Sequence, residues 1–90
     1  MFLTLTALND GNPEIVNLRE IRRAWISRNE VAQRFGNEVE SALVLVIEFV
    51  GATSMVRYVP VDRNERPDPK ETDAATALHN FNVALLGAVR

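Results

Sequence analysis

The stretch Leu43-Val44-Leu45-Val46-Ile47-Glu48-Phe49-Val50 decides the fold. Seven of its eight residues are apolar and five are β-branched or aromatic, which favours a β-strand. A strand with one wet face would alternate apolar and polar residues, and this stretch does not. It therefore predicts a strand buried on both faces, at the centre of a small sheet.

The residues that follow predict a partner strand for this stretch. Residues 51–54 predict a loop, and Met55 to Val61 predict the second strand. Pro60 places the end of this strand at an edge of the sheet. A four-residue loop would set the one acid of the first strand beside the one base of the second. This register opposes three pairs: Val50–Met55, Glu48–Arg57 and Val46–Val59.

An earlier hairpin is predicted at the N-terminus. Residues 2–8 alternate apolar side chains with threonine, which suits a strand with one partly exposed face. Residues 9–13 contain Asp-Gly and a proline and predict a turn, because Asp and Gly accept positive φ. Glu14 to Val16 then predict a short return strand.

The segment from Asn17 to Ser41 is compatible with two structures. In one, Asn17 caps a helix whose apolar stripe runs from Leu18 to Phe35. In the other, a single turn at 17–21 precedes a strand at 22–28, with Ala24 and Ile26 facing the core and Arg23, Trp25 and Ser27 opposite. We favour the strand, because Arg28 interrupts the helical stripe. Residues 29–41 are then expected to form a long mobile loop.

The C-terminal third predicts a surface linker followed by a helix. Residues 62–68 are charged and polar apart from Pro67. Asp68, Pro69 and Glu71 suit the N-cap, first position and first turn of a helix over 69–89. An apolar stripe would cover one face of the central hairpin. Its members are Ala74, Leu78, Phe81, Leu85 and Ala88, widened by Leu86 and Val89.

Composition limits the function classes. The 90 residues are enough for one domain, and 47% of them are apolar, which excludes disorder. Ten basic and twelve acidic residues give a net charge of −2, which argues against broad binding to nucleic acid or anionic membranes. The chain has no cysteine, no basic signal-peptide region and no apolar run long enough to cross a membrane. We expect a cytoplasmic protein without membrane contact.

No catalytic, cofactor or metal motif is visible. The single histidine, His79, has no second histidine or cysteine to share a metal or a reaction, and we expect it to pack on the helix surface. The four glycines are spread singly, so they form no phosphate-binding loop. The sequence therefore predicts a protein that is not an enzyme and binds no cofactor or metal.

The five arginines between residues 19 and 34 are the only concentration of basic residues. Arginine and tryptophan are enriched at protein-binding hot spots, so we expect a partner-binding surface at Arg22, Arg23, Trp25 and Arg28. Arginine beside an aromatic ring also suits a nucleic-acid phosphate or a stacked base. Acidic residues nearby cancel much of the charge, which makes nucleic acid the less favoured partner.

The N-terminal quarter contains the pattern Phe2 to Asn9 followed by Ile15-Val16-Asn17-Leu18-Arg19-Glu20-Ile21. This pattern resembles small bacterial proteins of the FlbD type. The resemblance implies two paired strands, two more strands, a C-terminal helical segment and a non-catalytic role connected with flagella. Val16-Asn17-Leu18 and Val59-Pro60-Val61 also resemble part of LytTR-type DNA-binding domains, which is the nucleic-acid alternative.

These observations predict an α+β domain. We expect a small antiparallel sheet or partly open barrel of about five strands, with a C-terminal helix packed on it. The expected function is a non-catalytic protein-interaction or assembly module. Self-association into a homo-oligomer is expected as well, because one helix can cover only one face of Leu43–Val50. The alternative function is a nucleic-acid-binding adaptor that uses the arginines of 19–34.

Overall fold

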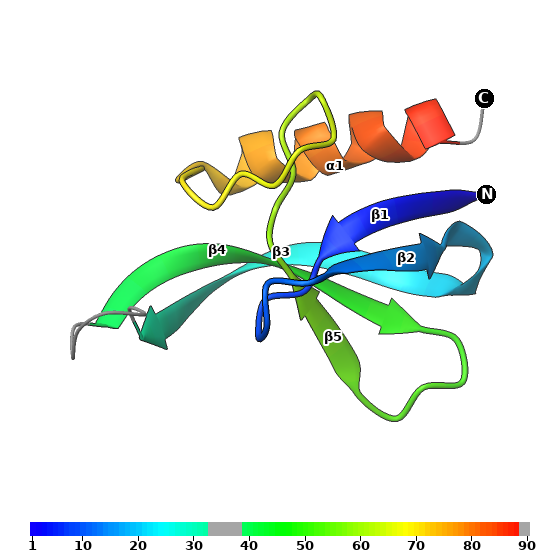
Figure 1. The fold of residues 1–90 in the computed structure, drawn as a ribbon, viewed down its shortest axis with the longest axis horizontal. Helices are drawn as coiled ribbons and strands as arrows, with labels where there is room; N and C mark the ends of the chain where they lie inside the picture. Colours follow the sequence, from blue (N-terminus) through cyan, green and yellow to red (C-terminus); the bar gives the residue numbers. More distant parts are fainter. Residues whose placement is uncertain (33–38, 89–90) are drawn as a thin grey trace.

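The computed structural model describes residues 1–32 and 39–88 and shows five strands, one short 3-10 helix and one α-helix (Figure 1). The elements are, in chain order, β1 (Phe2–Thr6), β2 (Pro13–Asn17), η1 (Leu18–Glu20), β3 (Ile21–Ala32), β4 (Val39–Phe49), β5 (Met55–Tyr58) and α1 (Ala74–Ala88). The predicted α+β class and strand number are confirmed. No helix in this part of the chain is long and apolar enough to span a membrane.

The strands form two antiparallel sheets, β1-β2 and β3-β4-β5. A single bridge between Ala7 and Tyr58 links them, supported by the Val59 N–H, which donates to the Thr6 carbonyl at 2.9 Å. The sheets therefore curve around a shared core without closing into a barrel. The two predicted hairpins, β1-β2 and β4-β5, are both present.

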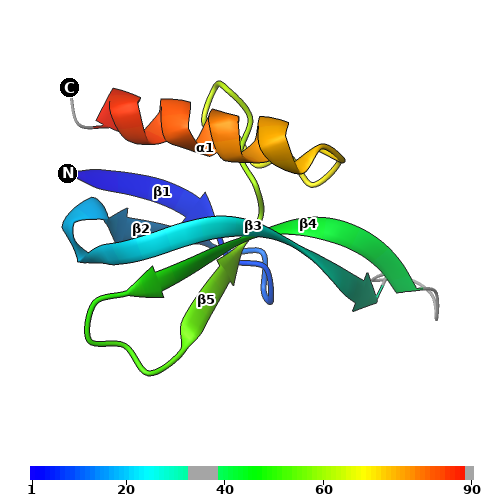
Figure 2. The same cartoon turned by 180° about the vertical axis from the view of Figure 1, so that it is seen from behind.

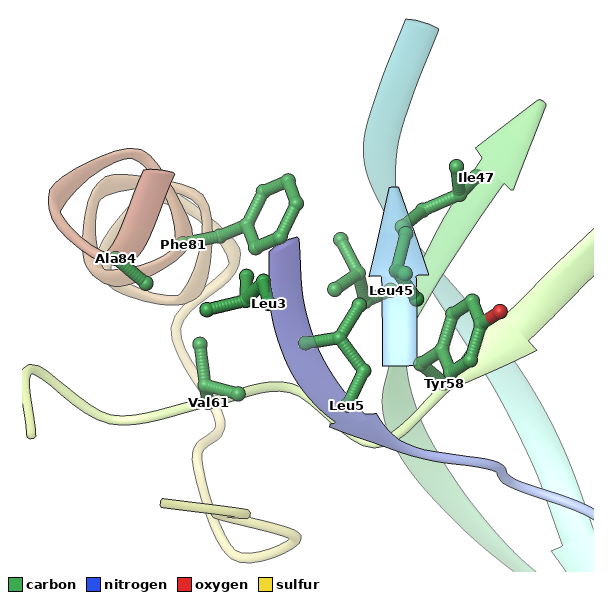
Figure 3. Packing of buried hydrophobic residues seen from close by; sticks show 9 residues of the cluster. Leu3, Leu5, Leu45, Ile47, Tyr58, Val61, Phe81 and Ala84 are labelled. Atoms are coloured by element: carbon green, nitrogen blue, oxygen red, sulfur yellow. The ribbon is translucent and has the colours of Figure 1, made fainter. Parts of the chain in front are cut away.

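The core lies between α1 and the curved sheets (Figure 3). Phe81 and Ala84 point from the helix toward Leu3 of β1, while Leu45 and Ile47 of β4 meet Leu5 on the other side of the cluster. Each of these side chains is at most 5% exposed. Their burial in one contiguous cluster is the main stabilising contribution available to a domain of this size.

The central strand is buried on both faces, as predicted, because every side chain from Leu43 to Ile47 is at most 4% exposed. Leu45 and Ile47 face the core cluster, where they meet Leu5 of β1. On the opposite face, Val46 lies in register between Trp25 of β3 and Arg57 of β5. A valine flanked on both sides by such long side chains is covered without a second layer of structure.

The strand interpretation of residues 22–28 is confirmed and the long helix is wrong. A short turn, η1, connects β2 to β3, and Ala24 and Ile26 pack against the core as predicted. The Asn17 side chain accepts the Arg19 N–H at 3.1 Å, so it caps one turn only. Phe35, the last member of the helical stripe, lies outside the described residues.

The expected loop over 29–41 is largely replaced by strand. β3 continues to Ala32 and β4 begins at Val39, and the two remain paired along this whole length. Paired strands satisfy each other's backbone groups, so polar residues such as Asn29 and Glu40 do not end the ladder. Only residues 33–38 of the expected loop lie outside the described part of the chain.

The predicted register of β4 and β5 is wrong by two residues. Glu48 lies opposite Met55, and Val46 opposite Arg57. The cause is a turn at residues 49–52, in which Gly51 has a φ of 79° and the Ala52 N–H donates to the Phe49 carbonyl at 3.2 Å. Val50 therefore belongs to the turn and is 65% exposed. A shift by two keeps every side chain on its predicted face.

The helix begins later than predicted, and only part of the predicted apolar stripe packs on the core: Phe81 is buried, and Leu85 and Ala88 pack against the core cluster, as predicted. Asp68 is not the cap, because its N–H donates to the Pro60 carbonyl at 2.7 Å, and α1 begins only at Ala74. The buried residues are Ala77, Asn80, Phe81 and Ala84. Of the predicted stripe, Leu78 is 45% and Leu86 51% exposed, and Val89 lies outside the described residues. The small alanines let the helix backbone approach the strands closely, which turns the leucines sideways.

The surface linker at 62–68 is ordered by one side chain. Asp62 Oδ1 accepts the N–H groups of Asn64 at 2.8 Å and Arg66 at 3.0 Å, and a bridge joins Val61 to Pro67. Asp62 thus closes a compact turn before the chain reaches α1. Figure 2 shows the whole fold from behind, with β3 running beneath α1.

Candidate protein-binding groove

A β-bulge at the start of β3 determines how its arginines are presented. Ile21 pairs with Phe49 and Arg23 with Glu48, so Arg22 is an extra residue in the ladder. An extra residue lets two successive side chains point to the same side of the sheet. Arg22 and Arg23 are accordingly both exposed, whereas Ile21 and Ala24 on either side of them pack toward the core.

Arg23 and Trp25 form a small cluster on the outer face of the three-stranded sheet. Arg23 Nε donates to Glu48 Oε2 at 2.7 Å, and its guanidinium lies 4.8 Å from the centre of the Trp25 ring. The Arg23 side chain remains 65% exposed, so both contacts are screened by water. The predicted pairing of Glu48 with Arg57 is replaced by this contact.

Arg28 does not belong to the same surface. It lies in register with Leu43 and follows Ala24 and Ile26 on the face that packs toward α1. Its Nη2 donates to the Thr72 carbonyl at 3.0 Å, which ties the segment before α1 to β3. The structure therefore brings Arg22, Arg23 and Trp25 together at one end of β3 and gives Arg28 a positioning role. Arg34, the last of the five arginines, lies outside the described residues.

An apolar groove of about 550 Å³ runs between β3 and α1. Two of its lining residues, Ile21 and Ala24, belong to β3, and all the others belong to α1. The helix contributes Ala75, Leu78, His79, Phe81, Asn82 and Leu85. The groove exists because the alanine side of α1 packs on the strands, which leaves the leucine side facing the space above β3.

Asp73 fixes the start of the helix that forms one wall of the groove. Its carbonyl accepts the Ala77 N–H at 3.0 Å, and its Oδ2 accepts the Thr76 hydroxyl at 2.6 Å. The hydrogen bond from the Thr76 side chain, with further bonds from the backbone N–H groups of Thr76 and Ala75, lowers the pKa of the Asp73 carboxyl. Asp73 is therefore the N-cap that the sequence interpretation assigned to Asp68.

A second, more polar hollow lies where the two sheets meet. It is lined by the β1–β2 turn and by β5, and it contains Asp10, Glu14 and Arg57. Tyr58 lies beside it in the core, and burial, followed by the nearby charge of Glu14, raises the pKa of its hydroxyl. Residues 1–32 and 39–88 contain no group of three or more acidic or histidine side chains placed to hold a metal ion.

The groove was not predicted as a site from the sequence. Leu78 and Leu85 were assigned to the buried stripe, and His79 to the helix surface beside it. The available signal was that α1 carries more apolar residues than one buried face needs, since Leu78, Val83 and Leu86 all remain exposed. Which side of the helix would face the strands depends on packing that a periodicity cannot resolve.

Comparisons of this chain with protein-family models, with curated proteins and with solved structures find no match. The resemblance of its N-terminal quarter to FlbD-type proteins stays a prediction.

Proposed function

We propose that this chain is a non-catalytic protein-interaction module that binds its partner in the groove between β3 and α1. The observation that carries this proposal is the position of Leu78, which lines the groove and is 45% exposed although Ala77 and Phe81 beside it on α1 are buried. Apolar surface that lies exposed in a concave site is typical of a surface that is buried on binding.

Self-association, which we expected from the sequence, is not part of the proposed function, because the reason for expecting it does not hold. A second copy was expected to cover the free face of the central strand. Within one chain, however, Val44 and Val46 on that face are at most 2% exposed. The expected cytoplasmic location likewise rests on the sequence alone and stays a prediction.

Nucleic-acid binding is the second candidate function. It would use Trp25 as a stacking surface and the arginines beside it as phosphate contacts. Arg23 already lies over the Trp25 ring and is paired with Glu48, so a base would have to displace it. This geometry makes a protein partner the better-supported proposal.

The test is an affinity capture with two matched variants. Leu78→Glu places a charge inside the groove, whereas Leu86→Glu places the same charge on α1 at an equally exposed residue that does not line the groove. We expect a captured protein to be lost with Leu78→Glu and retained with Leu86→Glu. Circular dichroism of both variants checks that they fold.

Two outcomes would contradict the proposal. A partner lost equally with both variants would place the contact elsewhere on α1 or show that it is not specific. Recovery of nucleic acid in place of protein, lost when Arg23 and Trp25 are replaced by alanine and reduced by added salt, would favour the second candidate function.

A further inference from the structure

We propose that the partner segment is an extended, acidic strand that pairs with the open edge of β3 and places its apolar side chains in the groove. This inference rests on the proposed function and specifies the chemistry of the partner.

The edge of β3 is available for pairing. In the described part of the chain β3 pairs with β4 only, so one side of a 12-residue strand has no strand neighbour. An exposed strand edge presents unpaired N–H and C=O groups, which another extended chain can satisfy. A helix bound at the same place would leave these groups without protein partners.

The groove lies on the side of β3 where alternate side chains of an added strand would point. Ala24 and Ile26 of β3 face α1, and Ala24 lines the groove together with Leu78 and Leu85. An added strand would lie about 4.8 Å from β3, with every second side chain directed to the same face. Its apolar side chains would therefore meet the leucines of α1.

The positive charge of β3 favours an acidic strand as the partner over a second copy of this chain. From Ile21 to Arg28, β3 contains three arginines and no acidic residue. Arg23 pairs with Glu48 and Arg28 bonds to Thr72, whereas Arg22 forms no ion pair within the described residues. Two copies joined along this stretch would bring arginines together, which is unfavourable for cross-strand neighbours. Carboxylates on the outer face of an added strand would lie next to Arg22.

The arginines and the bulge also have a protective explanation. Charged side chains and bulges on edge strands prevent uncontrolled pairing. That explanation accounts for Arg22 and for the irregularity at Ile21, but it does not account for an apolar groove along the same edge. A strand edge that carries arginines and lies next to an apolar groove is suited to selective pairing with an acidic strand.

The experiment uses three synthetic peptides of about nine residues and the complete chain. One peptide alternates valine with glutamate, one alternates valine with lysine, and one has the composition of the first with its valines grouped together. Amide hydrogen exchange of β3 and calorimetric affinity are measured for each peptide. We expect the valine–glutamate peptide to bind and to slow exchange of β3 amides, and the other two to bind much more weakly.

The matched variants are Arg22→Glu, on the edge strand, and Arg57→Glu, an exposed arginine on β5 on the other side of β4. Arg22→Glu should lower the affinity for the valine–glutamate peptide roughly threefold to tenfold and raise the affinity for the valine–lysine peptide, because it reverses the charge on one side of a surface charge pair. Arg57→Glu should change neither affinity appreciably in physiological salt, where screening extends over about 8 Å.

Three results would overturn the inference. They are binding that is indifferent to peptide charge, binding without protection of β3 amides, and sedimentation of the chain alone as a dimer whose β3 amides are protected. If none of the peptides binds while a captured partner still depends on Leu78, the groove is a protein-binding site of another kind. In that case the proposed function stands and the strand partner is wrong.

Discussion

At the scale of single residues, Leu45 and Val50 differ most in exposure, although both belong to one continuous apolar stretch. Leu45 is fully buried at the centre of the core, whereas Val50 is 65% exposed in the turn after β4. Leu45→Ala should lower the free energy of unfolding by about 2–5 kcal/mol, because it leaves a cavity. Val50→Ala should stay within about ±0.5 kcal/mol. Urea melts measure both, and equal losses would contradict the assignment of Val50 to the turn.

Tyr58 should make stability depend on alkaline pH. Burial, with the nearby Glu14 charge, raises its pKa above the ordinary value of 10.0. A raised folded pKa means that the contribution of the neutral hydroxyl is complete below pH 10.0 and is lost as pH rises through the folded pKa. Tyr58 is the only tyrosine, so phenolate absorbance follows it directly.

We expect the midpoint of the Tyr58 phenolate absorbance to lie above pH 10.0 in the folded chain and to return to the ordinary value in urea. Glu14→Gln should lower the folded midpoint only partly, because burial is the larger cause. A midpoint that is unchanged on unfolding would show that the hydroxyl is not buried as described.

At the scale of elements, the start of α1 depends on Asp73. Its carboxylate accepts the Thr76 hydroxyl, and hydrogen bonds lower its pKa below the ordinary value of 3.8. Asp73→Ala should therefore lower the urea midpoint of the chain, while Asp73→Asn, which keeps a cap acceptor, should lower it less. Asp68→Ala is the control, because Asp68 contributes its backbone N–H and not a cap.

The sign of the pH dependence follows from the lowered pKa. The contribution of the Asp73 carboxylate is complete above the unfolded value and is lost as pH falls through the folded value. Acid titration of urea stability should show this loss in the wild type and not in Asp73→Asn. A larger effect of Asp68→Ala than of Asp73→Ala would restore the helix start predicted from the sequence.

The register of the three-stranded sheet is tested by two double-mutant cycles. Arg23 and Glu48 are in contact across β3 and β4, so their coupling should be about 0.2–1 kcal/mol, as for other exposed ion pairs. Glu48 and Arg57 are diagonal neighbours on β4 and β5, and their coupling should be smaller. Stronger coupling of Glu48 with Arg57 than with Arg23 would support the register predicted from the sequence.

At the scale of the whole molecule, the arginines of β3 should keep the chain monomeric at micromolar concentration. Both faces of Leu43–Ile47 are already covered within one chain, so the central strand supplies no apolar surface to a dimer. Sedimentation equilibrium should give a mass near 10.1 kDa. Trp25→Ala should leave it unchanged. A mass near twice that value, lowered by Trp25→Ala, would show that the chain dimerises through the outer face of the sheet.

The sequence by itself determined the features that depend on local pattern and apolar content. The unbroken apolar stretch at Leu43 required a central strand, and the alternation around Trp25 assigned Ala24 and Ile26 to the core. The Asp-Gly turn and the charge of residues 62–68 identified the first hairpin and the surface linker. Each of these follows from chain geometry over a few residues, so no distant contact was needed to predict it.

Only the tertiary structure decided the features that depend on contacts between distant segments. The pairing of β3 with β4 directs Glu48 to Arg23, and the hydrogen bond of Asp68 to Pro60 delayed the helix to Ala74. The burial of Ala77 and Ala84 against the core leaves Leu78 exposed in the wall of the groove. A helix with apolar residues on two sides can bury either one, and only packing against the strands determines which side remains exposed.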